Sequence, residues 1–106
     1  MIRHLALFTA RDPADLPKMR ETFATLADIP GVRAFEVGEA TVDDARSDDR
    51  VDLVVHAVFD DAEALAAYKA HPTYLASVEV VRPLREVRLA VAYEVDDPAP
   101  PPPASA

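Results

Sequence analysis

The stretch Val-Asp-Leu-Val-Val-His-Ala-Val-Phe, residues 51–59, decides the fold of this chain. It is strongly apolar, too short for a helix and followed by two aspartates, so it predicts a buried strand. Its apolar residues fall on both faces, because Leu53, Val55 and Ala57 alternate with Val54 and Val58. A strand of this kind predicts a sheet that is covered on both sides.

The residues after this strand predict helix and then strand again. Asp-Asp-Ala-Glu at 60–63 resembles a capping box with Asp60 as the cap and Glu63 at the third helical position. Pro72 interrupts the helix after His71. A short helical turn over residues 73–78 and a last strand over 85–93, again apolar on both faces, are expected next.

The residues before it predict strand, helix and strand. Residues 2–9 form a short apolar run, and Asp12 with Pro13 then suits the start of an amphipathic helix of about four turns that ends at 29–31. Residues 32–39 alternate as a strand, and the polar segment 40–50 is expected to be an exposed connection. The order β-α-β-β-α-β is typical of the ferredoxin-like α+β class. Two helices cover only one sheet face, so the other apolar face predicts a homodimer.

Composition limits the possible partners. The chain has 106 residues, which suits one domain, expected over 1–95, with a flexible proline-rich tail over 96–106. Its 11 basic and 19 acidic residues give a net charge of −8, which disfavours nucleic acid and anionic lipid as partners. We find no membrane-spanning run, secretory signal, cysteine, metal-ligand pattern or phosphate loop, and therefore expect a cytoplasmic protein without metal or cofactor.

The chemistry centres on Tyr-Lys-Ala-His-Pro-Thr-Tyr, residues 68–74. Tyr68 and His71 are three residues apart, so they are neighbours on a helix and are our candidates for catalytic proton transfer. The alternatives are that His71 only caps the helix end and that Tyr68 only packs in the core. Tyr74 is a poor base at neutral pH, because phenols titrate near 10.

Other polar residues are given more ordinary roles. His4 shares a strand face with Ile2, Ala6 and Phe8, whereas His56 shares the opposite parity with Val54 and Val58 and should face the region between subunits. The arginines expected to be surface or interface charges that pair with Glu79 and Glu86 are Arg3, Arg82, Arg85 and Arg88.

Three segments together resemble one known family. Met-Ile-Arg-His-Leu-Ala-Leu-Phe at 1–8, Ile-Pro-Gly-Val-Arg-Ala-Phe-Glu-Val-Gly at 29–38 and Tyr-Lys-Ala-His-Pro at 68–72 are similar to the stress-responsive dimeric α/β barrel (Dabb) family. The resemblance implies a homodimer in which two four-stranded sheets form a barrel with the helices outside. Most members have no defined activity. Some are cofactor-free polyketide cyclases of the olivetolic acid cyclase type, whose catalytic tyrosine matches Tyr68 and whose catalytic histidine falls at Tyr74.

The resemblance also implies a small apolar cleft between sheet and helices. The residues expected to line it are His4, Ala6, Phe23, Val55, Ala57 and Tyr74. No reaction is assigned to the chain, and one open function is that of a cofactor-free cyclase- or lyase-like enzyme on a polyketide-like or phenolic ligand. A non-catalytic stress-associated dimer and an enzyme like the antibiotic-biosynthesis monooxygenases stay open as alternatives.

Overall fold

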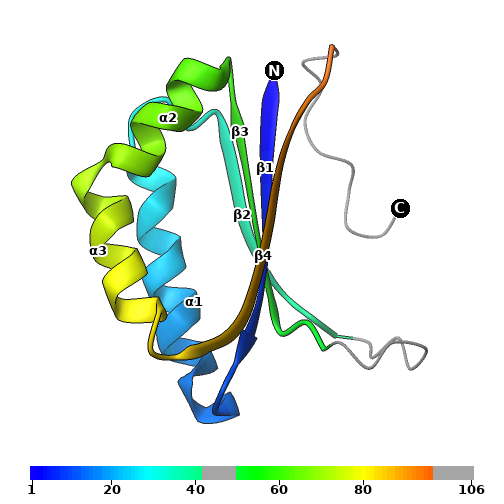
Figure 1. The fold of residues 1–106 in the computed structure, drawn as a ribbon, viewed down its shortest axis with the longest axis vertical. Coiled ribbons are helices and arrows are strands. Elements are labelled where there is room, and N and C mark those ends of the chain that lie inside the picture. Colours follow the sequence, from blue (N-terminus) through cyan, green and yellow to red (C-terminus); the bar gives the residue numbers. More distant parts are fainter. Residues whose placement is uncertain (42–49, 97–106) are drawn as a thin grey trace.

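The computed structural model describes residues 1–41 and 50–96, which form one sheet with all helices on one side (Figure 1). The sheet is antiparallel, with strand order β2-β3-β1-β4. The elements follow in the order β1 (Ile2–Ala10), η1 (Pro13–Asp15), α1 (Leu16–Ala24), η2 (Thr25–Asp28), β2 (Ala34–Glu39), β3 (Leu53–Phe59), α2 (Ala62–Ala70), α3 (Pro72–Val81) and β4 (Arg85–Glu94). The predicted ferredoxin-like α+β fold is confirmed, and residues 97–106 of the expected tail lie outside the described part.

The first helical segment differs from the single helix that was predicted. A 3₁₀ turn capped by the Asp12 side chain comes first, then α1, then a second 3₁₀ turn. Pro13 and Pro17 have no backbone N–H to donate, so each fits only the first turn of a helical segment. Gly31, at φ 93°, makes the turn that follows. β2 then begins only at Ala34, and Val32 packs against the core.

The two helices that precede β4 in the chain also differ in detail. The cap of α2 is Asp61, whose carboxylate accepts a hydrogen bond from the Ala64 amide at 2.8 Å, so the prediction of Asp60 was one residue early. α3 extends to Val81, well beyond the predicted short turn, because Pro72 starts a new helix as well as ending the old one.

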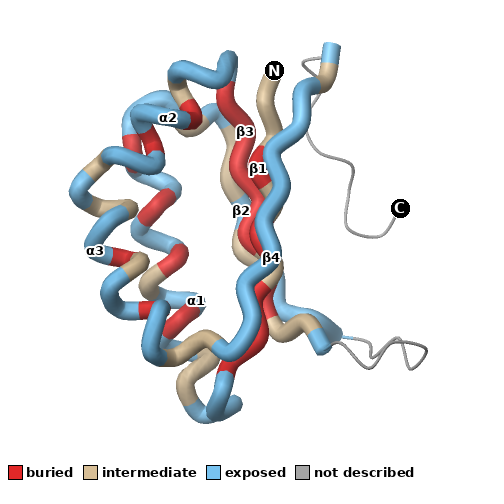
Figure 2. The backbone as a smooth tube through the Cα atoms, viewed as in Figure 1, coloured by how far each residue is buried: buried red, intermediate tan, exposed pale blue. Residues whose placement is uncertain are grey.

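The core lies between the sheet and the helices (Figure 2). The inner residues of β3 are fully or almost fully buried, and the register places His4 opposite Ala57, Ala6 opposite Val55 and Phe8 opposite Leu53. These side chains therefore share one face of the sheet. The helices complete the core with Met19, Phe23, Leu26, Leu65, Tyr68 and Val81.

The other face of the sheet carries no helix (Figure 1). By register it presents Leu5, Leu7, Val54, Val58, Leu89 and Val91, which we call the bare sheet face. Leu89 is 60% exposed and Val91 52% exposed, and β4 is exposed along almost its whole length (Figure 2). Large apolar side chains on a continuous open surface are unusual for a monomer.

Candidate functional site

A cavity of about 240 Å³ lies between the sheet and the helices. Its apolar wall comes from β1, β3, α1, η2 and α3, through Ala6, Phe8, Phe23, Leu26, Val55, Val78 and Val81. Its polar lining is His4, Tyr68, Tyr74, Ser77, Arg82, Arg85 and Arg88. The volume is below that of sites for drug-sized ligands, so the cavity suits a small molecule with an apolar body.

Most of the residues predicted for the cleft line this cavity. His4, Ala6, Phe23, Val55 and Tyr74 do so, as does Tyr68. Ala57 faces the helices but is fully buried and does not reach the cavity wall.

His71 lies apart from the cavity lining. It connects α2 to α3, and its Nδ1 accepts a hydrogen bond from the Thr73 amide at 3.1 Å. The imidazole therefore caps the start of α3, whereas the sequence suggested a role at the end of the preceding helix. The three-residue spacing from Tyr68 does not bring the two side chains together, because Pro72 opens a new helix immediately after His71.

Tyr68 instead lies among aromatic rings. It is 1% exposed, and its ring centroid is 4.8 Å from that of Phe59, 5.0 Å from that of Tyr74 and 6.4 Å from that of His4. Burial and the neighbouring Tyr74 raise the pKa of the Tyr68 hydroxyl above its usual value of 10. The phenol is therefore protonated at neutral pH and is not available as a base.

His4 is the second titratable group of the cavity. Burial, followed by repulsion from Lys69 and Arg88, lowers the pKa of its imidazole from 6.5 to about 4. The ring is therefore neutral at pH 7. Its Nδ1 is buried and has no hydrogen-bond partner among residues 1–41 and 50–96. An unpaired buried nitrogen of this kind is uncommon and calls for an explanation.

Of the ion pairs predicted for Arg82, Arg85 and Arg88, the described residues contain that of Arg82 alone. Arg82 does pair with Glu79, at 3.9 Å, but Arg85 and Arg88 line the cavity and form no ion pair with Glu86 or any other described residue. Regular alternation along β4 would place Arg85 and Arg88 on opposite faces of the sheet. An irregularity in the pairing of β1 with β4 puts both on the helix-facing side.

His56 lies on the opposite side of the sheet from His4, as predicted. It is buried, and its Nδ1 is 3.7 Å from a carboxylate oxygen of Glu36. Burial and the nearby Arg3 lower the pKa of His56, while Glu36 opposes that shift.

The part of the chain that the structure describes contains no helix long and apolar enough to cross a membrane.

Solved structures share this architecture. A dimeric ferredoxin-like protein of unknown function from Thermobifida fusca is 28% identical, with a TM-score of 0.73 and coverage of 89% of this chain and 90% of that chain. A Dabb family protein from Mesorhizobium loti is 23% identical, with a TM-score of 0.72 and coverage of 89% and 95%. SnoaB, a cofactor-independent oxygenase from Streptomyces nogalater, is 20% identical, with a TM-score of 0.69 and coverage of 94% and 97%. The latter two similarities concern the fold alone.

The family is given by the sequence profile of the stress responsive A/B barrel domain, which matches residues 2–95. No curated protein matches the chain at a significant level. The profile covers every strand and helix described above and leaves out only the first residue and the end of the chain. The chain therefore belongs to the stress responsive A/B barrel domain (Dabb) family.

Proposed function

We propose that the working molecule is a homodimer joined through the bare sheet face. Its support is the open apolar surface of β1, β3 and β4, since such a surface is stable in water only when a partner covers it. A second copy of the same face is complementary to it in a two-fold dimer. The Thermobifida fusca relative, at 28% identity, is itself described as dimeric.

We also propose that each protomer is a cofactor-free, cyclase- or lyase-like enzyme that moves protons on a small polyketide-like or phenolic carbonyl compound. The observation that carries this proposal is the buried, unpartnered Nδ1 of His4 in a ring that lines the cavity beside Tyr68. Leaving a buried polar atom unpaired costs about 1–3 kcal/mol. A polar group of a bound ligand would offset that cost.

The chemistry follows from the protonation states of the two groups. The neutral His4 imidazole accepts a proton from the carbon next to the ligand carbonyl, and the Tyr68 hydroxyl donates a hydrogen bond to the oxygen that becomes the enolate. The enolate carbon then attacks a second carbonyl carbon of the same ligand, so that one carbon–carbon bond forms. His4 returns its proton to the oxygen of that second carbonyl, which leaves the protein unchanged.

The test uses acetophenone, a small apolar ketone whose methyl protons exchange slowly with solvent. In D₂O, the wild-type dimer should accelerate this exchange as followed by proton NMR. His4→Gln should lose the acceleration, and Tyr68→Phe should reduce it by roughly 100-fold or more, because the enolate loses a donor. His71→Asn is the matched control, since asparagine can replace the cap of α3 and exchange should persist. Loss in His71→Asn with retention in His4→Gln would assign the proton transfer to His71.

A second candidate, a binding dimer without turnover, is favoured by the packing of Tyr68. Its ring is enclosed between Phe59 and Tyr74, as a purely structural residue would be. This function predicts that acetophenone shifts the NMR signals of cavity residues but exchanges no faster than in buffer. An oxygenase function like that of SnoaB has only the shared fold in its favour.

A further inference from the structure

Arg85 and Arg88 reach the same cavity because β4 contains a bulge. Thr9 pairs with Val87, but the next residue of β1, Ala10, pairs with Arg85, so Glu86 has no opposite residue. Two residues three apart in a regular strand face opposite sides. The extra residue reverses the alternation, and Arg85 therefore shares the helix-facing side with Arg88, which pairs with Phe8.

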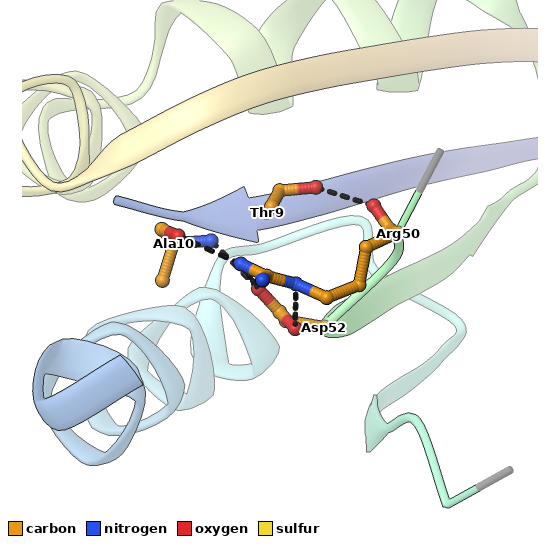
Figure 3. A network of polar contacts seen from close by, with 4 residues as sticks. All are labelled: Thr9, Ala10, Arg50 and Asp52. Carbon is orange, nitrogen blue, oxygen red and sulfur yellow. Dashed lines mark hydrogen bonds and ion pairs between the residues drawn. The ribbon is translucent and has the colours of Figure 1, made fainter. Parts of the chain in front are cut away.

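Side chains just before β3 hold the end of β1 in place (Figure 3). The Ala10 amide donates to a carboxylate oxygen of Asp52 at 2.9 Å, and the Ala10 carbonyl accepts from Arg50 at 3.1 Å. These bonds satisfy the Ala10 backbone groups beyond the end of the β1–β3 pairing. Arg50 also pairs with Asp52, and on the β4 side the Arg11 guanidinium donates to the carbonyl of Arg85 at 3.0 Å.

The two guanidinium groups have no compensating charge among the residues that the structure describes. Within residues 1–41 and 50–96, neither Arg85 nor Arg88 makes a side-chain hydrogen bond or an ion pair, although the whole chain carries a net charge of −8. Burial and repulsion from Arg88 and Arg82 lower the pKa of Arg85. Like charges held together beside a cavity form a binding site for a group of the opposite charge.

We infer that Arg85 and Arg88 bind the anionic group of the ligand, so that the cavity takes small apolar carboxylates. This inference rests on the proposed use of the cavity as a ligand site. The planar guanidinium matches a carboxylate through two parallel hydrogen bonds, whereas the side chains of Phe8, Phe23 and Leu26 suit an apolar body. A bound carboxylate would also counter the repulsion that Arg88 exerts on the protonated form of His4. It would therefore raise the pKa of His4 towards neutrality.

The experiment compares two probes of the same shape, 2-naphthoate and 2-naphthamide, by calorimetric titration of the full-length protein. The wild type should bind the carboxylate about 10-fold or more tightly than the amide, because only the carboxylate forms charge-assisted bonds. Combined Arg85→Gln and Arg88→Gln should reduce this preference to less than about twofold, because binding of the carboxylate weakens more than binding of the amide. Arg33→Gln removes an exposed arginine that pairs with Asp60, and should keep the preference.

Other results would overturn the inference in distinguishable ways. Equal binding of both probes to the wild type would refute the anion site while leaving the proposed apolar cavity intact. Failure of both probes to bind would refute the use of the cavity itself. Should the glutamine variant unfold, combined Arg85→Lys and Arg88→Lys keeps both charges but loses the fork geometry, and must still prefer the carboxylate. An NMR titration must show the pKa of His4 rising with 2-naphthoate and not with 2-naphthamide.

Discussion

His4 is the residue at which burial and chemistry conflict most directly. An apolar residue such as leucine would suit this position in the apolar core better than a histidine. His4 is nevertheless only 3% exposed, and its Nδ1 has no hydrogen-bond partner among the described residues. Neighbouring positive charges further disfavour protonation. The protein therefore maintains a neutral imidazole in its cavity at a cost in stability.

That cost predicts a pH dependence of folding. The pKa of His4 is about 4 in the folded protein and about 6.5 when the chain is unfolded, so between these values the unfolded chain binds a proton that the folded one does not. The free energy of unfolding should therefore fall as pH decreases from 6.5 towards 4, by roughly 3 kcal/mol from this residue. Urea unfolding at a series of pH values measures it.

The control for this prediction is His4→Gln, which cannot titrate. It should show a clearly shallower decline, with a remainder from His56, whose pKa is lowered in the same direction. Parallel pH profiles for the two proteins would show that His4 does not carry the effect.

At the scale of elements, the end of β1 is fixed by side chains more than by regular pairing. Asp52 anchors the Ala10 amide and also pairs with Arg50 (Figure 3). Asp52→Ala leaves a partly buried N–H without its acceptor, and should lower the free energy of unfolding by roughly 1–3 kcal/mol. Thermal unfolding of Asp60→Ala provides the comparison, since its exposed pair with Arg33 contributes at most about 1 kcal/mol. Equal losses in both variants would show that the network does not stabilise the end of β1.

The bulge in β4 is a feature of the fold that the sequence pattern does not predict. The strands follow from alternating apolar residues, the helix-facing position of His4 follows from the family resemblance, and the capping of the second helix by an aspartate follows from side-chain chemistry. The facing of Arg85 depends on a register shift made by contacts between strands, which no local pattern encodes.

The site was predictable to a similar extent. Residues on regular strands and helices, such as Ala6, Val55 and Phe23, line the cavity as expected. His71 does not, because Pro72 redirects the chain at that residue and turns the imidazole to the start of α3. Spacing along a helix is informative only where the helix continues.

At the scale of the whole molecule, the two sides of the sheet have different tasks. The helix-facing side encloses the cavity, and the bare sheet face is our proposed dimer interface. Leu89→Asp places a charge on that face and should convert a dimer to a monomer, because the charge would be buried without a partner. Sedimentation velocity at micromolar concentration measures the result.

Leu75→Asp is the matched control. Leu75 is 53% exposed, close to the 60% of Leu89, but it lies on α3 in the helical layer. This variant should stay dimeric. A monomeric wild type, or dissociation of both variants alike, would contradict the proposed interface.

The position of β1 in the middle of the sheet has a consequence for the order of folding. Ile2 pairs with Glu94 on one side and with Phe59 on the other, so β1 joins strands that are made much later than itself. The sheet around β1 is complete only after β4 has been made. Long-range pairing of this kind is intrinsically slow, and it leaves the apolar first strand open to aggregation until β4 joins it.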